Sequence, residues 1–379
     1  MSHIFLVAAE DSGDALGADV IDALRAADPS VRISGIGGAK MRERGVVSDV
    51  DMSGLAVLGF IDGIKAFGRV KRAVEAAGEA VIKADPDAVV LIDSWGFMWR
   101  LARLLKERGH RAKRIKLIGP QVWATRPGRA RVLAQWCDHL LCIHAFEQPF
   151  YERWGLPTTV IGNPALQRLP KGDGGAFRKR YSIAVDAPVV GLLPGSRRSE
   201  IRRVAPALFE AAGRAAQKDS RRTIVCMVAP SVAADVDALA KAQPRFLLIR
   251  DETEKADAFA AMDVALACSG TVTTELASQG AAVIVGYKLG WVTWALARLF
   301  LMRSRFITLL NVAAGKEIAP EFVQTRLMAA NLAEAAERLL SDPAALEMQR
   351  KGQAEALKLM AGPGKPAAQI AAETILKLA

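Results

Sequence analysis

Residues 191–201 read GLLPGSRRSEI, and this short stretch decides the fold. An apolar run stops at a Pro-Gly-Ser turn, and two arginines and a glutamate follow at once. That order predicts a strand, a tight turn and the start of a helix. The turn resembles a phosphate-binding loop, but the Gly-Lys-Ser/Thr that closes such a loop is missing. We therefore expect a strand-end turn at which Arg197 meets an anion.

The pattern of strand, turn and helix repeats on both sides of this stretch, which predicts parallel sheets with crossover helices. Strands, some with the turn that follows, are expected at 4–9, 31–38, 88–93, 114–120, 139–143 and 158–164, and again at 188–196, 222–230, 245–251, 263–270 and 281–288. Helices are expected at 12–27 with Ser12 as N-cap, around 65–84 and around 200–216. The predicted class is α/β, with two Rossmann-like, doubly wound domains that face a central cleft.

The chain of 379 residues has a natural length for two domains. The segment around 165–187 is a suitable linker, because it contains Pro170 and the run GDGG at 172–175. We expect a first domain at 1–165, a second at 166–345, and C-terminal helices at 346–379 that are free to pack back on the first domain.

Composition and charge narrow the classes of protein that fit. The N-terminus lacks the basic start of a signal peptide, and no run reaches the roughly 18–20 apolar residues of a membrane span. The net charge is +11, and the segment 100–131 holds eleven Lys and Arg against one acid, Glu107. Such a tract suits anionic lipid or a phosphorylated substrate, unless it is a solvated helix face. No nucleic-acid-binding module is recognisable, so nucleic acid is not expected as a partner.

The cysteines and histidines do not form an evident metal site. Cys137, Cys142, Cys226 and Cys268 include no C-x-x-C pair, so we expect buried free thiols. His139 and His144 lie near two of them, which leaves a metal site there as the less favoured alternative. We expect neither a metal nor a cofactor.

Three stretches in the first half follow predicted strands and carry candidate side chains. In AAEDSGDALG (8–17) the acids Glu10, Asp11 and Asp14 stand where a dinucleotide site would place phosphates, so their carboxylates suit sugar hydroxyls. The alternative is plain capping of the helix by Asp11 or Ser12, and Ser12 and Gly13 are candidates on the sugar side as members of the same turn. Asp93 ends the strand at 88–93 and is a candidate general base. The loop GPQVWATRPGRAR (119–131) adds Trp123 and several arginines, or is an ordinary surface loop.

The strongest local pattern lies in the second half, in CSGTVTTEL (268–276). A strand ends in Cys268, and the turn of Ser269, Gly270 and Thr271 opens a helix whose N-terminal N–H groups favour an anion. Glu275 lies one turn into that helix, where a carboxylate can accept hydrogen bonds from ribose. Together with Gly195, Ser196 and Arg197 these residues suit a diphosphate without a metal, since no DxD acid pair stands nearby. These features predict a glycosyltransferase that binds its acceptor on the first half of the chain and a nucleotide-sugar donor on the second half.

Over nearly its whole length the chain resembles the lipid-A-disaccharide synthase family. Ten stretches carry the resemblance in the family's order: AAEDSGDALGADVIDAL, SGIGGAKMRERG, MSGLAVLGFIDGI, VLIDSWGF, PQVWATRPGR, FEQPFYERWGLPTTVIGNP, LLPGSRRSEI, CSGTVTTELA, VGYKLGWVTWALARL and LLNVAAGKEIAPEFVQ. The resemblance implies a GT-B-like fold and inverting transfer of 2,3-diacylglucosamine from UDP-2,3-diacylglucosamine to 2,3-diacylglucosamine 1-phosphate (lipid X). It also implies roles for Asp93 as the base and for Arg197 at the donor diphosphate.

The resemblance further assigns residues to the two substrates. On the UDP side it implies Ser196, Ser269, Gly270, Thr271, Glu275, Tyr287 and Asn311, and on the sugar side Glu10, Ser12 and Asp14. The chain differs from the family's usual sequence at SWGFM after Asp93, at GPQVWAT and at Leu310. The first two changes touch the acceptor side, whereas the donor turns are nearly intact.

Acylated substrates imply a peripheral protein at the cytoplasmic surface of the inner membrane. The segments 53–72 and 291–302 mix apolar and basic residues and suit an interface, unless they pack within their own domains. Two other functions stay open: a different UDP-sugar enzyme of the same fold, such as an epimerase or a transferase with another acceptor, and a non-catalytic relative that binds UDP or lipid.

Overall fold

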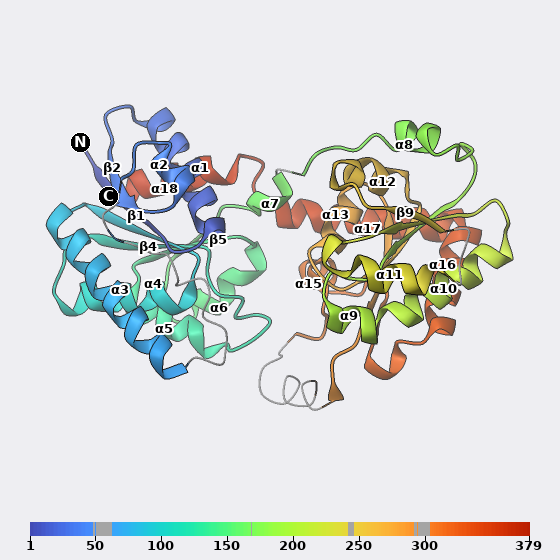
Figure 1. Ribbon diagram of the computed structural model, residues 1–379. Helices are drawn as coiled ribbons and strands as arrows, with labels where there is room; N and C mark the ends of the chain where they lie inside the picture. Colours follow the sequence, from blue (N-terminus) through green and yellow to red (C-terminus); the bar gives the residue numbers. More distant parts are fainter. Residues whose placement is uncertain (48–49, 51–62, 168, 242–245, 292–293, 295–303) are drawn as a thin grey trace. The chain divides into compact units, whose positions relative to one another are not determined.

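The computed structural model describes residues 1–47, 50, 63–167, 169–241, 246–291, 294 and 304–379, and it divides into two compact units (Figure 1). Unit 1 comprises Met1–Gln167 and Met360–Ala379, and unit 2 comprises Arg168–Leu359. The boundaries between the units therefore fall after residues 167 and 359, whereas the boundaries predicted from the sequence fall after residues 165 and 345. Residues 53–62 of the segment 53–72, and all of the segment 291–302 except Trp291 and Trp294, lie outside the described residues.

Unit 1 is built on a parallel sheet of six strands in the order β2-β1-β3-β4-β5-β6. The strands are β1 (His3–Ala8), β2 (Arg32–Ile36), β3 (Ala88–Ile92), β4 (Lys113–Leu117), β5 (His139–Cys142) and β6 (Thr158–Val160). The helices are α1 (Asp11–Ala27), α2 (Ala39–Arg42), α3 (Gly63–Ala84), α4 (Trp95–Glu107), α5 (Gly128–Trp136), α6 (Gln148–Glu152), α7 (Pro164–Gln167) and α18 (Ala367–Leu378).

Unit 2 repeats this architecture with the strand order β12-β11-β10-β7-β8-β9, again all parallel. The strands are β7 (Val189–Leu193), β8 (Thr223–Met227), β9 (Phe246–Ile249), β10 (Val264–Cys268), β11 (Ala282–Tyr287) and β12 (Glu321–Val323). The helices are α8 (Gly174–Arg180), α9 (Arg198–Arg203), α10 (Ala205–Lys218), α11 (Ala233–Ala240), α12 (Lys255–Ala261), α13 (Val272–Ser278), α15 (Leu309–Ala314), α16 (Ala329–Ser341) and α17 (Pro343–Ala361). The two doubly wound α/β halves predicted from the sequence are confirmed.

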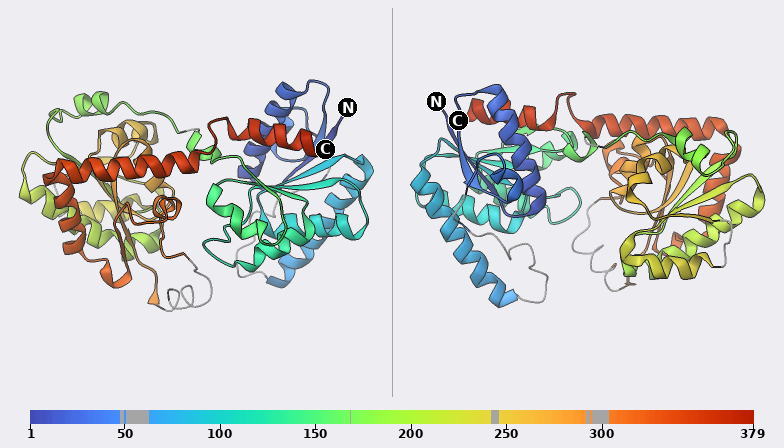
Figure 2. Two further views of the ribbon diagram at one scale, coloured as in Figure 1. Left: turned by 180° about the vertical axis from the view of Figure 1, so that it is seen from behind. Right: turned by 45° about the horizontal axis from the view of Figure 1, so that its top comes forward.

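Each sheet is covered by helices on both faces, because successive side chains of a strand point to opposite sides. In unit 1, Ile4 and Leu6 of β1 join the core beneath α1 and α18, whereas Phe5 and Val7 join the core beneath α3, α4 and α5 (Figure 1). Helix α18 comes from the far end of the chain and packs beside α1 (Figure 2).

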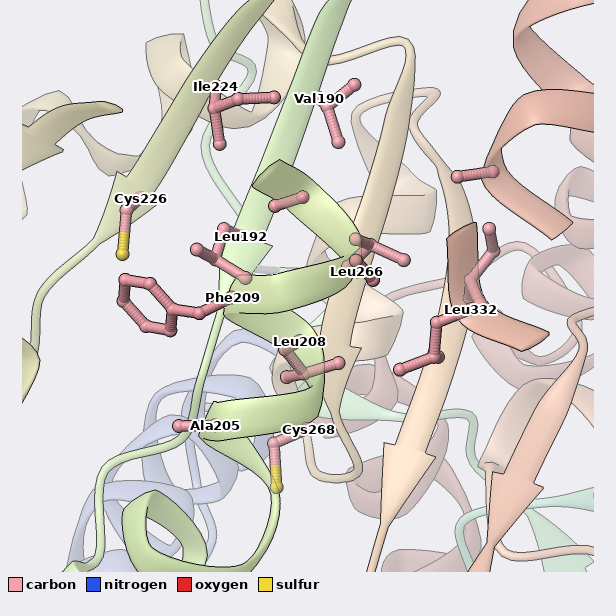
Figure 3. Packing of buried hydrophobic residues seen from close by; sticks show 14 of the residues in the cluster. Val190, Leu192, Ala205, Leu208, Phe209, Ile224, Cys226, Leu266, Cys268 and Leu332 are labelled. Carbon is pink, nitrogen blue, oxygen red and sulfur yellow. The ribbon is translucent and has the colours of Figure 1, made fainter. Parts of the chain in front are cut away.

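The core of unit 2 shows the same packing at close range in Figure 3. Leu208 and Phe209 of α10 lie over Leu192 of β7 and Leu266 of β10, and Leu332 of α16 closes one side of the cluster. This layer fixes β7 and β10 side by side, so the turns that follow these two strands are adjacent.

Two local predictions are corrected. The single helix expected around 200–216 is two helices, because α9 ends at Arg203 and α10 begins anew with Pro206 in its first turn. The N-cap of α1 is Glu10 rather than Ser12, and it makes no side-chain capping bond. None of the helices within the described ranges is long and apolar enough to cross a bilayer.

The strand orders locate the ligand sites. In a doubly wound sheet, ligands bind at the carboxyl ends of the strands where the strand order reverses. That point lies between β1 and β3 in unit 1 and between β7 and β10 in unit 2. Asp93 follows β3, and Arg197 and the Ser269-Gly270-Thr271 turn follow β7 and β10, so the principal candidates stand at the two reversal points.

Candidate active site

A pocket of about 440 Å³ lies at the reversal point of unit 2. Seven of the nine residues predicted for the UDP side line it: Gly195, Ser196, Arg197, Ser269, Gly270, Thr271 and Glu275. They come from the turns after β7 and β10 and from the first turn of α13. The pocket has room for a nucleotide-sized ligand by the usual size of such sites.

The turn after β7 is held by a carboxylate of the helix that follows. Glu200 Oε2 accepts hydrogen bonds from the backbone N–H groups of Ser196 (3.0 Å) and Arg197 (3.2 Å). Gly195 has φ +108°, and a Cβ there would lie 2.6 Å from Glu200 Oε2, so the turn requires glycine. The Arg197 side chain is 78% exposed and touches Glu200 Oε1 at 3.3 Å. Because the two amides are already used, the group that this turn offers to a ligand is the Arg197 guanidinium.

The turn after β10 supplies backbone donors instead. Ser269 N–H donates to Gly286 O at 3.3 Å, but the N–H groups of Gly270, Thr271 and Val272 donate to no backbone carbonyl in the described part of the chain. A Cβ at Gly270 would meet nothing within 4 Å, so the approach to these amides is open. Amides and a guanidinium on neighbouring turns suit the two phosphates of a nucleoside diphosphate.

Glu275, the predicted ribose ligand, is paired inside the pocket. Its Oε2 lies 2.6 Å from Lys255 Nζ, and both side chains are about one-quarter to one-third exposed (23% and 34%). Lys255 begins α12, and Arg250, which follows β9 and pairs with Asp237, also lines the pocket. Neither Lys255 nor Arg250 was predicted from the sequence as a site residue. The strand expected at 245–251 could have pointed to them. The carboxyl end of that strand lies beside β8, at the same edge of the sheet as the pocket.

Two predicted UDP-side residues do not line the pocket. Tyr287 ends β11 and is half-buried, and burial raises the pKa of its phenol. Asn311 is wholly buried, and its amide donates to Ala319 O and Glu321 Oε1 at 2.8 Å each. Its Oδ1 accepts from the backbone N–H of Ile318 (2.8 Å) and of Ala319 (2.9 Å). The amide of Asn311 therefore has all its hydrogen bonds within the protein.

The turn that carries Asp93 has an unusual backbone. Asp93 and Ser94 have φ of +48° and +34°, a left-handed conformation that non-glycine residues rarely adopt. Beneath the turn lies the wholly buried Lys116 of β4, whose Nζ donates to the carbonyl oxygens of Leu91 (3.1 Å), Asp93 (2.5 Å) and Leu117 (3.2 Å). Burial lowers the pKa of Lys116 to about 8. This lysine was not predicted from the sequence as a site residue.

The acids at the start of α1 divide into two groups. The carboxylate of Asp14 is buried and accepts from the backbone N–H groups of Gly38 (2.7 Å), Lys40 (2.8 Å) and Met41 (3.1 Å), so it caps α2. Glu10 and Ser12 are exposed and follow β1, the strand that pairs with β3. Gly13 is buried, and a Cβ at this position would be in ordinary contact with Ala8 and Ile92. Of these residues, Glu10 and Ser12 have side chains available beside the Asp93 turn.

Trp123 belongs to a small aromatic cluster after β4 and β5. It meets Phe146 edge-on, with centroids 5.4 Å apart, and Phe146 stacks on His144 at 4.9 Å. Trp123 Nε1 and His144 Nδ1 are buried without a hydrogen-bond partner in the described residues. Burial lowers the pKa of His144 to about 4, so its ring is neutral at pH 7. His144 and Phe146 were not predicted as site residues.

The four cysteines are buried free thiols, as expected. Burial raises the pKa of each to about 12, so they are protonated at neutral pH.

Comparisons with known proteins point to one family. A family model described as Lipid-A-disaccharide synthetase matches residues 4–374. The lipid-A-disaccharide synthase of Rhodospirillum centenum is 36% identical over 378 residues, covering 99% of this chain and 94% of that protein. The synthase of Gluconobacter oxydans is 36% identical over 373 residues, covering 98% and 89%.

Among solved structures, the UDP-GlcNAc 2-epimerase from Neisseria meningitidis bound to UDP-GlcNAc matches with a TM-score of 0.62 and 15% identity, covering 100% of both chains. At that identity the likeness shows the fold alone. The predicted GT-B-like fold is confirmed by it.

Proposed function

Since this chain belongs to the lipid-A-disaccharide synthase family, we propose that unit 2 holds the donor nucleotide and that unit 1 activates the acceptor. The protein is a UDP-sugar-dependent glycosyltransferase of lipid A biosynthesis. Its reaction joins 2,3-diacylglucosamine from UDP-2,3-diacylglucosamine to the 6-hydroxyl of lipid X. The products are the β-1,6-linked lipid A disaccharide 1-phosphate and UDP.

One observation supports the binding of the donor nucleotide to unit 2. Arg197 and the open Ser269-Gly270-Thr271 turn line the same pocket. As the bond from the sugar C1 to the phosphate oxygen breaks, negative charge accumulates on the diphosphate. The Arg197 guanidinium and the amides of Gly270 and Thr271 stabilise that charge. The ribose hydroxyls are proposed to bind Glu275. When the nucleotide binds, the Lys255 ammonium leaves Glu275 and contacts the phosphates.

Asp93 is the proposed general base. Its carboxylate takes the proton of the acceptor 6-hydroxyl while that oxygen forms the bond to C1 of the donor sugar, and the configuration at C1 inverts. Its support is its position at the reversal point of the unit 1 sheet and the buried Lys116 that fixes its backbone. Glu10 and Ser12, beside it on the β1 side, are proposed to bind acceptor hydroxyls, and Trp123 offers its buried N–H from the β4 side.

Lipid X as acceptor and a place at the cytoplasmic surface of the inner membrane are further parts of the proposal. Both substrates of the family carry acyl chains, so the enzyme must meet them where such chains reside. The tract at 100–131 supplies positive charge on the same unit as Asp93, which suits the anionic lipid around the substrates.

The test is a turnover assay with UDP-2,3-diacylglucosamine and lipid X dispersed in detergent. We expect UDP release together with disaccharide formation, and Asp93→Asn should lower kcat by about 100-fold or more, as loss of a general base does. Asp85→Asn is the matched control, because Asp85 is also an aspartate with positive φ (+44°) and precedes the same strand. If the folded wild-type protein forms no disaccharide but turns over unacylated UDP-N-acetylglucosamine, the proposal is wrong.

A further inference from the structure

Helix α4 has two chemically different faces. Its buried face consists of Phe97, Met98, Leu101, Ala102 and Leu105, which pack on the unit 1 sheet. The other face carries Trp95, Trp99 and Arg103 at spacings of four residues, so they form one stripe along the helix. None of the three is fully buried, and the two tryptophan rings lie 6.3 Å apart.

Residues of α5 and the stripe on α4 together line a depression. This surface depression of about 830 Å³ lies between the two helices, and none of the described residues that line it is acidic. Its aromatic and charged lining consists of Trp95, Trp99, Trp136, Arg100, Arg103 and Arg129, which we call the Trp/Arg face. A side-chain set that alternates large aromatic rings with guanidinium groups is unlike an ordinary solvated helix surface, where Lys and Glu predominate.

Each tryptophan of the Trp/Arg face is paired with one arginine. The guanidinium carbon lies 4.6 Å from the ring centroid for Arg100 over Trp99, 5.2 Å for Arg129 over Trp95 and 5.6 Å for Arg103 over Trp136. Stacking of this kind holds the cations in place at the surface, and a guanidinium carries several N–H donors that match phosphate oxygens. Arg100 also donates to Gly96 O at 2.6 Å, and Arg103 pairs with Glu107 at 2.8 Å.

The positive surface continues onto α3. Lys71 lines a second depression, of about 470 Å³, which shares Trp99, Arg100 and Arg103 with the first. Arg69, Lys71 and Arg72 are exposed. Acids appear on this side, where Glu75 and Glu107 line the same depression, and they mark one edge of the basic surface.

We propose that the Trp/Arg face binds the surface of an anionic phospholipid bilayer. Tryptophan prefers the level of the lipid headgroups, and arginine binds their phosphates with paired N–H groups, so the two side chains together suit such a surface. The inference rests on the proposed function, because acylated substrates bring the enzyme to a membrane. Helix α4 begins two residues after Asp93. A membrane bound at the Trp/Arg face would therefore lie close to the proposed general base.

The experiment is sedimentation of the full-length protein with vesicles, without sugar substrates. Vesicles of phosphatidylcholine mixed with phosphatidylglycerol are compared with vesicles of phosphatidylcholine alone. The wild type should bind the anionic vesicles and not the neutral ones. The triple variant Arg100→Gln, Arg103→Gln, Arg129→Gln should bind the anionic vesicles about 100-fold more weakly, at roughly fivefold for each basic residue lost near such a surface.

The control variant removes the same charge elsewhere: Arg214→Gln, Arg221→Gln, Arg338→Gln, three exposed arginines of unit 2. Arg214 matches Arg103 closely, since both side chains are 50% exposed and each pairs with a glutamate four residues away. This variant should bind the anionic vesicles within about threefold of the wild type, because membrane affinity of a basic residue depends on its nearness to the surface. A second variant, Trp99→Ala, tests the aromatic part and should weaken binding while thermal unfolding stays close to that of the wild type.

Equal weakening in the two triple variants would overturn the proposal, and so would a wild type that binds RNA or an acidic peptide but neither kind of vesicle. Turnover in detergent separates this inference from the proposed function. If the Trp/Arg face serves docking, the triple variant on α4 and α5 keeps its detergent turnover. If the wild type binds anionic vesicles but forms no disaccharide, the membrane surface stands and the proposed function fails.

Discussion

Lys116 is a wholly buried ammonium that donates to three backbone carbonyls beneath the Asp93 turn. Leaving such carbonyls unpaired costs on the order of 1–3 kcal/mol each. The same ammonium keeps Asp93 and Ser94 in their left-handed conformation, which costs energy of similar size. The position of the proposed base therefore depends on the Lys116 ammonium, although burial disfavours its charge.

The Lys116 proton gives a prediction with opposite signs for stability and activity. The pKa of Lys116 is about 8 in the folded protein against an ordinary 10.5, so between these values the unfolded chain binds more protons. Its contribution to the free energy of unfolding thus rises with pH, by about 1.4 kcal/mol per pH unit. Activity should fall over the same range, since the neutral amine donates fewer hydrogen bonds to the turn.

Urea unfolding and kcat measured from pH 7 to 10 test this prediction, with Lys116→Met as the variant and Lys113→Met as the control. Lys113 is exposed on the same strand. The wild type and the control should show both trends, and Lys116→Met should show neither and have a lower kcat throughout. Parallel pH profiles for all three proteins would contradict the prediction.

Single residues also show which site features can be predicted from the sequence and which cannot. Arg197 and Gly270 were predictable because each directly follows an apolar strand pattern, and the carboxyl ends of such strands converge. Asp14 looked like a ligand-binding acid, but its carboxylate caps a helix that begins 25 positions later, and no local pattern reveals that partner. Lys116 was hidden for a different reason, since a lysine within a strand is ordinarily exposed.

At the scale of elements, the fold follows from the sequence more completely than the contacts between elements do. The strands β1 to β11 were predictable from apolar runs, whereas the short β12 (Glu321–Val323) was not predicted. The helix expected around 200–216 is interrupted at Val204, and Pro206 lies in the first turn of α10. Asn311 illustrates the missing contacts. It ties α15 to the segment before β12, together with Glu321, whose carboxylate also accepts from Thr308 N and Thr308 Oγ1.

We predict that Asn311→Asp destabilises unit 2 without directly changing the nucleotide pocket. The variant replaces a donor 2.8 Å from Glu321 Oε1 with a second carboxylate, and we expect a loss of at least about 3 kcal/mol at pH 7. Lowering the pH to 5 should recover part of the loss, because two close carboxylates share a proton. UDP affinity of the folded protein should stay within about threefold, since each tenfold requires 1.4 kcal/mol of lost contact.

The control for this prediction is Asn331→Asp, because the amide of Asn331 makes one hydrogen bond, to Arg326 O at 2.9 Å. Urea unfolding and titration calorimetry with UDP give the two readouts. A variant at Asn311 that folds normally but no longer binds UDP would show that this residue meets the nucleotide after all.

At the scale of the whole molecule, unit 1 is assembled from both ends of the chain. Ile370, Ala371 and Ile375 of α18 belong to the same buried cluster as Leu16, Val20 and Leu24 of α1. Deleting residues 360–379 would expose this cluster, at a cost on the order of 5 kcal/mol for two isoleucines and their neighbours. Unit 2, by contrast, keeps its whole length and its pocket.

We therefore expect the deletion variant to lose the thermal transition of unit 1 and all turnover, and to bind UDP with nearly unchanged affinity. Differential scanning calorimetry and UDP titration are the measurements. Restoring 360–379 as a separate peptide should return part of the stability of unit 1. Loss of UDP binding in the deletion variant would show that the two units do not fold independently.

This arrangement also sets the order in which the molecule can be completed during its synthesis. Domains usually fold as units while the chain is made, the N-terminal one first. Here the segment that completes the first unit, 360–379, is made after the whole of the second unit, which is one uninterrupted stretch. Unit 2 is thus complete first, and the nascent unit 1 keeps the apolar face of α1 uncovered by α18 until residues 360–379 have been made.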